Sequence, residues 1–156
     1  MYAARQWSVR NSRKLEWLYQ CFEGILIALH PFWLWIGYSR IEKPIRAVEK
    51  SVKRVMFDCQ MCGHCLLNST GMSCPMNCPK NVRNGPCGGV RHDGHCEVKP
   101  EMRCVWVEAA EGAARMRQGS TIQHVQLAAD MQLKGRSSWL RVARGEHGAS
   151  SAGGRA

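Results

Sequence analysis

The middle of this chain lacks the residues that build a hydrophobic core. Between Cys59 and Cys104 it has no aromatic residue and almost no long apolar run, whereas Gly and Pro are frequent. Such a segment cannot bury enough apolar surface to offset the entropy lost on folding. We therefore expect bonds between metal and cysteine sulfur to supply the missing folding free energy.

The chain also lacks a continuous apolar run of membrane-spanning length. Its most apolar stretch, Trp17 to Tyr38, is interrupted by Glu23, His30 and Pro31, whereas a transmembrane helix needs about 20 continuous apolar residues. Residues 1–14 are polar and basic and no small-residue cleavage site follows, so the stretch is a poor signal peptide. We therefore predict a cytoplasmic protein, with contact to a membrane surface as a minor alternative.

No residue pattern typical of catalysis is present. The sequence contains no evident nucleophile with a neighbouring base, and Gly88-Gly89 neither follows a predicted strand nor opens a predicted helix, which argues against a nucleotide site. A chain of 156 residues without a repeated strand and helix pattern cannot form an eightfold βα barrel. We expect a non-catalytic chain that works with a partner.

What the chain does have is cysteine. Eight of its nine cysteines fall within 46 residues, enough for two centres of four thiolates each. Their spacing is Cys59-x2-Cys62-x2-Cys65-x8-Cys74-x3-Cys78-x8-Cys87-x8-Cys96-x7-Cys104. We predict that all eight bind metal: the first three join one later cysteine, and the remaining four form the second centre.

A disulfide framework is the alternative, which this density of cysteine would favour in a secreted domain. The predicted reducing compartment argues against it, because clustered cytoplasmic cysteines more often hold metal. The ninth cysteine, Cys21, is left out of the ligand set. We expect it on the apolar face of a helix, as a buried free thiol.

The spacing favours iron–sulfur clusters over zinc. Three cysteines as close as Cys59, Cys62 and Cys65 typically wrap one corner of a cluster, and proline follows both Cys74 and Cys78, as in bacterial ferredoxins. The ferredoxin pattern has three residues where this chain has eight, so we do not predict a ferredoxin fold. We predict two [4Fe–4S] clusters, with two Zn²⁺ as the alternative.

Other residues near the cysteines have weaker claims. His64, His92 and His95 could replace a thiolate, although such residues more often occupy exposed loops. Glycines after Asn84 would free backbone amides for tight turns or for hydrogen bonds to sulfur. These glycines are Gly85, Gly88 and Gly89. Lys80 and Arg83 are expected to be solvated.

The net charge of +10 raises the question of nucleic acid. Residues 1–58 carry ten basic and five acidic side chains, residues 59–104 five and three, and residues 105–156 seven and four. The excess is therefore spread along the chain, and the ligand loops lack the interleaved basic and aromatic residues typical of zinc modules that bind nucleic acid. Nucleic-acid binding is a minor alternative.

Apolar periodicity predicts helices on both sides of the cysteines. Residues 13–30 have an apolar face formed by Leu15, Leu18, Phe22, Ile25, Leu26 and Leu29. Ser12 is the expected N-cap, and Pro31 is expected to end or kink the helix. The aromatic run Phe32 to Ile36 then needs a cover, from the chain itself and from a partner.

The second expected helix covers residues 41–56. Its apolar stripe is Ile41, Ile45, Val48, Val52 and Val55. Its basic stripe, expected to face solvent, is Lys43, Arg46, Lys50 and Lys53.

Two helices are expected after the cysteines. One covers 105–117 and is weakened by Gly112. The other starts at Ser120, has apolar positions Ile122, Val125, Ala129 and Leu133, and stops at Gly135.

The predicted fold class is a small α-rich domain with an irregular, metal-stapled cysteine module and helices flanking that module at both ends. We divide the chain into an apolar N-terminal helical segment (1–40), a cysteine-rich domain with flanking helices (41–140) and a flexible tail (141–156).

Several motifs together resemble one family. They are Cys59-Gln-Met-Cys62-Gly-His-Cys65-Leu-Leu-Asn-Ser-Thr-Gly71, Cys74-Pro-Met-Asn-Cys78-Pro-Lys80, Arg83-Asn-Gly-Pro-Cys87-Gly-Gly89, Gly94-His-Cys96-Glu97 and Cys104-Val-Trp106. With Ser137-Ser-Trp139, the pattern over roughly 42–140 resembles the small, cysteine-rich C-terminal domain of methylenetetrahydrofolate reductase, which is a separate subunit in acetogen-type enzymes. The apolar segment Trp17 to Tyr38 has no match in it.

The resemblance implies an accessory subunit in one-carbon (tetrahydrofolate) metabolism. The expected partner is a TIM-barrel reductase that binds the flavin and the folate, and an electron-donor protein could join the complex. In such complexes the small subunit would hold iron–sulfur clusters and pass electrons toward the flavin, or would bind zinc as a structural subunit that stabilises the barrel.

Overall fold

The computed structural model describes residues 2–126 and 128–145, and its regular elements are helical. The α-helices are α1 (Tyr2–Arg10), α2 (Ser12–Ala28), α3 (His30–Ile36), α4 (Tyr38–Phe57), α5 (Val105–Ala113) and α6 (Ser138–Ala143). Short 3-10 helices are η1 (Pro75–Asn77), η2 (Gly119–Gln123) and η3 (Met131–Leu133). Within the described ranges there is no β-strand, only isolated bridges between Val90 and Cys96 and between His95 and Arg103. The α-rich prediction is confirmed.

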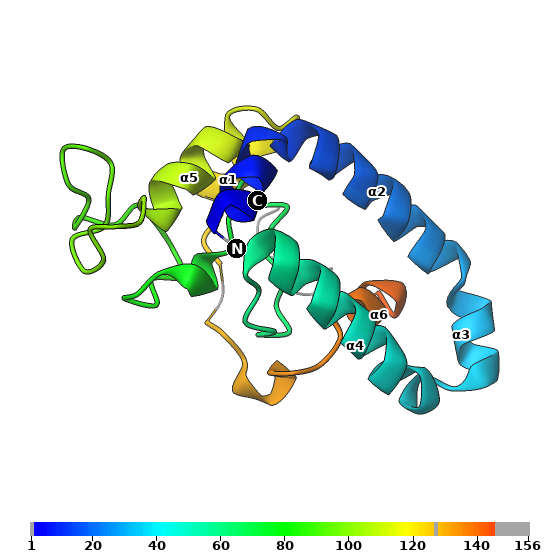
Figure 1. The fold of residues 1–156 in the computed structure, drawn as a ribbon. Helices are drawn as coiled ribbons and strands as arrows, with labels where there is room; N and C mark the ends of the chain where they lie inside the picture. The colour runs from blue at the N-terminus through cyan, green and yellow to red at the C-terminus, as the bar shows by residue number, and fades with distance from the viewer. Residues whose placement is uncertain (1, 127, 146–156) are drawn as a thin grey trace.

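Two long helices frame the molecule. Figure 1 shows α2 and α4 as two arms joined at one end by the short α3. Helix α6 packs against both arms, and α1 packs against α4 and α5 at the opposite end. The irregular segment that contains the cysteines follows α4 and lies next to α5 (Figure 1). The arms therefore form a helical support for the cysteine loops.

Helix α2 has the predicted extent but not the predicted cap. Its N-cap is Asn11, and Ser12 lies in the first turn, where its hydroxyl donates a buried hydrogen bond of 2.8 Å to the carbonyl of Gly112. The helix ends at Ala28, and Pro31 then lies in the first turn of α3, where its missing N–H costs nothing. The break predicted at Pro31 is confirmed.

The inner face of α2 is more polar than its periodicity predicts. Leu15 and Phe22 are turned partly inward and Leu26 is buried, but Leu18, Ile25 and Leu29 are exposed. Cys21 is also exposed, so its predicted burial is wrong.

Carboxylates occupy part of the interior between these helices. Glu16 is buried and its carboxylate accepts backbone N–H bonds from Arg117 (2.8 Å) and Gln118 (3.0 Å) just after α5. Arg5 of α1 and Glu108 of α5 form a second buried link at 3.1 Å. The helices are thus fixed to one another partly by charge-assisted hydrogen bonds, each stronger than a neutral one.

Helix α4 turns part of its apolar stripe outward. Ile41 is buried, whereas Val48, Val52 and Val55 are 57%, 43% and 63% exposed. The buried positions nearer the cysteines are Glu49 and Lys53. The sequence predicts that Lys53 faces solvent together with Lys43, Arg46 and Lys50. Those three are exposed, but the prediction for Lys53 is wrong.

Gly112 lies within α5 at a point where the backbone of the cysteine loop comes close to the helix. A Cβ at Gly112 would lie 2.0 Å from the carbonyl oxygen of Gly71, and a Cβ at Gly71 would lie 2.3 Å from the amide nitrogen of Ala113. Gly71 also has a positive φ of 58°, which glycine adopts without strain. The two glycines allow the cysteine loop to contact α5 backbone to backbone.

The helix predicted from Ser120 to Leu133 does not form. The described part of this region contains only η2 and η3, and Val125 is 84% exposed. Ile122 packs against the cluster of Cys104, Trp106 and Ala109 whereas Val125 faces solvent, so the predicted apolar positions do not share one buried face. The predicted flexible tail lies mostly outside the described residues, since 146–156 are not described.

The aromatic run after Pro31 is covered only in part. Trp33 is half-buried and its Nε1 donates to the carbonyl of Leu26 at 3.2 Å, but Phe32, Leu34 and Trp35 stay exposed. Among the helices in the described ranges, none combines the length and the hydropathy that a bilayer span requires.

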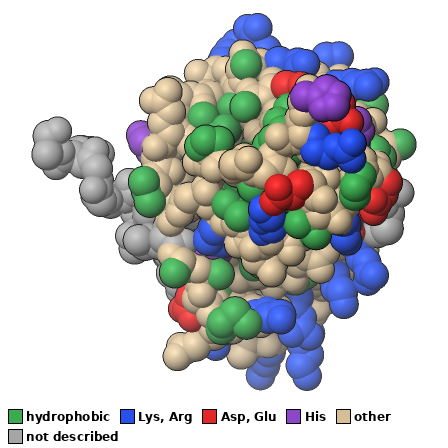
Figure 2. Space-filling model, turned by 90° about the vertical axis from the view of Figure 1, so that its left-hand side faces the viewer, with side chains coloured by type: hydrophobic (Ala, Val, Ile, Leu, Met, Phe, Trp, Pro, Cys, Tyr) green, Lys and Arg blue, Asp and Glu red, His purple; other side chains and the backbone are tan. Residues whose placement is uncertain are grey.

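The face formed by α5 and the cysteine loops carries charges of both signs. Figure 2 shows acidic and basic side chains next to one another on this face. Lys80 pairs with Glu97, and Arg103 pairs with Glu111 at 2.6 Å. This mixture differs from the continuous basic surface that nucleic-acid binding needs.

Candidate metal centre

The segment after α4 turns sharply three times before it reaches the third cysteine. Asp58 ends α4 in the left-handed region with φ of 52°, and Met61 and Gly63 follow with φ of 49° and 75°. A Cβ at Gly63 would lie 2.1 Å from the carbonyl oxygen of Leu133, so only glycine fits there. These turns fold the Cys59–Cys65 segment back on itself, with η3 packed against it.

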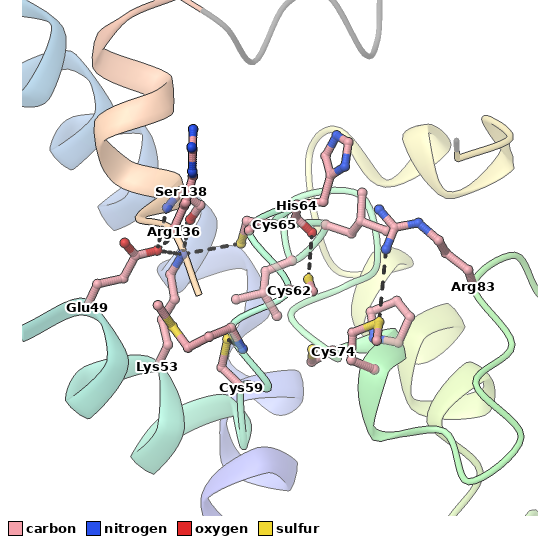
Figure 3. A pocket seen from close by; sticks show the side chains of 16 residues that line it. Glu49, Lys53, Cys59, Cys62, His64, Cys65, Cys74, Arg83, Arg136 and Ser138 are labelled. Atoms are coloured by element: carbon pink, nitrogen blue, oxygen red, sulfur yellow. Dashed lines mark hydrogen bonds and ion pairs between the residues drawn. The ribbon is translucent and has the colours of Figure 1, made fainter. Parts of the chain in front are cut away.

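Four cysteines line one pocket at this point. They are Cys59, Cys62, Cys65 and Cys74, and Figure 3 shows their side chains around the same cavity. All nine cysteines of the chain lie in the described ranges, and all nine are free thiols. The structure thus places Cys74 beside the first three cysteines, which spacing alone had left open.

The side of this pocket that carries Cys74 is apolar. Cys74 belongs to a buried cluster with Phe57, Leu67, Met72 and Met116, against which Cys65 also packs. Burial raises the pKa of Cys74 to about 12 and that of Cys59 to about 11. Thiolates are therefore costly here unless nearby positive charge compensates them.

Lys53 brings one such charge to the pocket. Its ammonium group lies 3.5 Å from Cys65 Sγ, 2.7 Å from a carboxylate oxygen of Glu49 and 2.6 Å from the Ser138 hydroxyl (Figure 3). Burial opposes the charge on Lys53, but its attraction to Cys65 and Glu49 outweighs burial and raises its pKa. Lys53 therefore carries a positive charge next to sulfur.

Glu49 holds this lysine and the start of α6 together. The carboxylate accepts hydrogen bonds from the hydroxyls of Ser137 (2.6 Å) and Ser138 (2.5 Å) and from the backbone N–H of Ser138 (3.2 Å). Burial disfavours the charged form of Glu49, but the Lys53 charge and these hydroxyl bonds lower its pKa overall. A fixed carboxylate at the first turn of α6 is also favoured by the helix dipole.

Backbone amides point at sulfur in both halves of the cysteine segment. The Met61 amide donates to Cys59 Sγ at 3.4 Å, and the Gly89 amide donates to Cys87 Sγ at 3.4 Å. Such N–H bonds stabilise thiolates and shift the potential of a bound cluster. The expected role of glycine is thus confirmed at Gly89. Gly88 lies in a turn together with Gly89, as expected, and a Cβ at Gly88 would meet no atom within 4 Å. Gly85 instead packs against Trp106.

The remaining four cysteines are gathered less tightly. Cys87 and Cys104 share an apolar cluster with Trp106 and Ala109, and Cys96 pairs with Val90 of the same cluster through an isolated bridge. Cys78 is buried at the end of η1. Three of the four are therefore close to one cluster, and Cys78 lies on a neighbouring loop.

The histidines near the cysteines differ in their distance from the four-cysteine pocket. His64 and Arg83 line the four-cysteine pocket, and burial together with the charges of Arg141 and Arg83 lowers the pKa of His64. His92 is exposed, and His95 lies 3.4 Å from a carboxylate oxygen of Asp93. Of His64, His92 and His95, therefore, His64 alone lines the pocket of the first group of sulfurs.

The donor set fits a sulfur-bound metal centre. Four free thiols line one cavity, with a lysine and a backbone amide directed at two of them, and soft sulfur donors select zinc or iron–sulfur clusters. Within residues 2–126 and 128–145, no three His, Cys, Asp or Glu side chains lie close enough together, as they stand, to hold one metal ion. Metal binding by the eight cysteines therefore stays a prediction.

Sequence reasoning missed the polar support of this pocket. The sequence predicts a solvent-facing Lys53 and indicates no role for Glu49, and it includes Ser137 and Ser138 only in the family motif Ser137-Ser-Trp139. A signal was present, because Glu49 and Lys53 are four residues apart, the spacing of a helical ion pair.

Comparison with known families agrees with these features. The family described as methylene-tetrahydrofolate reductase C terminal matches residues 38–132, which include α4, all eight clustered cysteines and α5. No match was found among curated proteins or among solved structures. Helices α1 to α3 lie outside the matched range. Since the match covers more than half of the sequence, this chain belongs to the methylene-tetrahydrofolate reductase C-terminal family.

Proposed function

We propose that this chain is an accessory, electron-transferring subunit of a methylenetetrahydrofolate reductase complex in tetrahydrofolate metabolism. Its family and its role beside a reductase are supported by the match over residues 38–132. The partner would be a TIM-barrel subunit that carries the flavin and binds the folate. The observation that carries the proposal is the pocket lined by Cys59, Cys62, Cys65 and Cys74.

In this proposal two iron–sulfur clusters are bound by eight cysteines. The first group is Cys59, Cys62, Cys65 and Cys74, and the second is Cys78, Cys87, Cys96 and Cys104. A [4Fe–4S] cluster, when bound, supplies one-electron transfer at a potential set by the surrounding charges and hydrogen bonds.

The chain's own residues would tune the first site. Lys53 offers a positive charge to Cys65, and the Met61 amide donates to Cys59. Both interactions favour extra negative charge on the sulfur-bound centre, so both would raise its reduction potential. The apolar cluster around Cys74, against which Cys65 also packs, limits the access of water to these two sulfurs.

Zinc is the second candidate, because four thiolates also suit a structural Zn²⁺ site. It predicts a colourless subunit that stabilises the barrel and carries no electrons. The close Cys59-x2-Cys62-x2-Cys65 spacing favours iron over zinc.

One experiment distinguishes the electron-transfer role from the structural zinc role. The anaerobically purified chain is reduced with dithionite, freed of excess reductant and mixed with the oxidised flavin subunit of the reductase. Electron transfer predicts bleaching of the flavin absorbance, while the Cys59→Ser variant should transfer much less. A flavin that stays oxidised with the wild-type chain contradicts the electron-transfer role.

A further inference from the structure

The outward face of α4 carries an apolar stripe that the described residues leave uncovered. We call this face the outer stripe. It consists of Pro44, Ala47, Val48, Ser51, Val52 and Val55, all of them exposed. These residues recur at intervals of three and four, which places them along one side of the helix.

The same helix buries an ion pair on its other side. Glu49 and Lys53 are 1% and 4% exposed, although Val52 and Val55 next to them face solvent. A helix at the surface of a globular protein usually shows the reverse arrangement, with apolar residues toward the core and charged residues toward solvent. An exposed stripe of this length on an otherwise charged helix is typical of a surface that another protein covers.

A row of cations borders the outer stripe. Lys43, Arg46, Lys50 and Arg54 are exposed and also recur at intervals of three and four. Among the described residues, no carboxylate forms an ion pair with any of the four. The row therefore presents uncompensated positive charge beside the apolar contact surface.

These charges decide what kind of partner fits. A second copy of this chain would bring the same row of cations to the interface and so add repulsion. A membrane-surface helix usually inserts large residues such as Trp, Phe and Leu, whereas the outer stripe has only Val, Ala, Ser and Pro. Small side chains instead allow a second helix to approach closely.

We infer that the outer stripe docks a helix of the reductase partner that has a matching apolar face and an acidic flank. This inference rests on the proposed function and names the surface through which it operates. A TIM barrel has a ring of helices on its outside. The outer stripe would therefore contact one of these helices.

The position of the stripe suits electron transfer. Lys53 reaches from the inner side of α4 to within 3.5 Å of Cys65 Sγ, and the outer stripe lies on the opposite side of the same helix. An α-helix with its side chains is about 10–12 Å across. A partner docked on the stripe would therefore approach the four-cysteine pocket to about one helix diameter.

The test measures binding of the separately purified reductase barrel from the same organism, by titration calorimetry at low and high salt. Val52→Asp would place a carboxylate against the acidic partner and is expected to weaken binding at least ~30-fold. Val98→Asp is the matched control, because Val98 is similarly exposed but lies in the cysteine loops. It should change affinity less than about twofold.

A charge variant tests the basic row. Lys50→Glu with Arg54→Glu should weaken binding about tenfold and remove most of its salt dependence. The control variant, Lys99→Glu with Lys134→Glu, reverses two exposed charges elsewhere. It should change neither the affinity nor its salt dependence. Circular dichroism and metal content of each variant separate loss of docking from loss of fold.

The outcomes are distinct. Wild-type affinity for Val52→Asp, or equal effects of Val52→Asp and Val98→Asp, overturns the docking surface while the proposed function stands. No binding by the wild-type chain overturns both. Flotation with vesicles of anionic phospholipid that is lost in Val52→Asp, or a wild-type dimer that Val52→Asp dissociates, would replace the reductase by a membrane or a second copy and refute the inference.

Discussion

Replacing Lys53 by methionine tests whether the buried polar support of the four-cysteine pocket stabilises the protein. Methionine keeps much of the length of the side chain but removes its charge. Glu49 would then remain buried without its cationic partner, at a site where it is 1% exposed. The change also removes the contact of 3.5 Å to Cys65 and the hydrogen bond of 2.6 Å to Ser138.

The expected cost follows from these contacts. Breaking one partner of a buried ion pair usually costs about 3–5 kcal/mol. Glu49 keeps three other strong donors, the two serine hydroxyls and the Ser138 amide, so we expect the lower end, about 3 kcal/mol. For a chain of this size that corresponds to a fall in Tm of roughly 6–12 °C.

The pH dependence gives a second, independent check. Since the pKa of Glu49 is lowered in the folded protein, its favourable contribution is present above the unfolded value of about 4.3 and is lost as pH falls through the folded value. Without Lys53, burial would raise the pKa of Glu49 instead. The stability difference between wild type and Lys53→Met should therefore be large at pH 7 and smaller below about pH 4.

The assay is denaturant unfolding of anaerobically purified protein, followed by circular dichroism at both pH values. Lys50→Met is the matched control, because Lys50 is on the same helix but exposed, and it should change the unfolding free energy by less than about 0.5 kcal/mol. Equal stability of Lys53→Met and Lys50→Met would refute the reasoning, as would a difference between wild type and Lys53→Met that does not depend on pH.

Two further substitutions test how the helices are fixed. Gly112→Ala gains about 1 kcal/mol of helix propensity but places a methyl group 2.0 Å from the Gly71 carbonyl oxygen, so the protein should lose about 1–3 kcal/mol by thermal unfolding. Gly24→Ala, where a Cβ meets no atom within 4 Å, should be stabilising, and a stabilised Gly112→Ala would contradict the close contact. Arg5→Met should lower the unfolding free energy by about 3 kcal/mol, because it leaves the buried carboxylate of Glu108 without its cationic partner. The double variant Arg5→Met with Glu108→Leu should recover most of that loss. A double variant that stays as unstable as Arg5→Met would show that the loss comes from packing rather than from charge.

The sequence predicts helices close to α2, α4 and α5 but does not predict α6, which packs against both α2 and α4. Helices α2, α4 and α5 are found close to their expected positions, because their apolar residues recur with helical period and proline marks the break before α3. The segment from Ser120 to Leu133 has the same period, yet only 3-10 turns form in its described part. Periodicity shows which residues share a face but not whether another element covers that face.

The orientation of α4 could not be read from its composition. Its valines give the stronger apolar signal, but Glu49 and Lys53 are turned inward, where Ser137 and Ser138 satisfy the carboxylate from 88 and 89 residues away in sequence. The partner that makes a buried charge acceptable lies outside any local window. For the same reason, spacing alone could not choose Cys74 as the neighbour of the first three cysteines.

The most direct test of the central claim is the iron and acid-labile sulfide content of the anaerobically purified chain, compared with Cys74→Ser and Cys21→Ser. The account predicts about eight of each per chain in the wild type and in Cys21→Ser, and about half as much in Cys74→Ser. A colourless wild type with about two zinc ions per chain would contradict the iron–sulfur assignment. Equal metal content in Cys74→Ser and Cys21→Ser would contradict the four-cysteine pocket as a metal site.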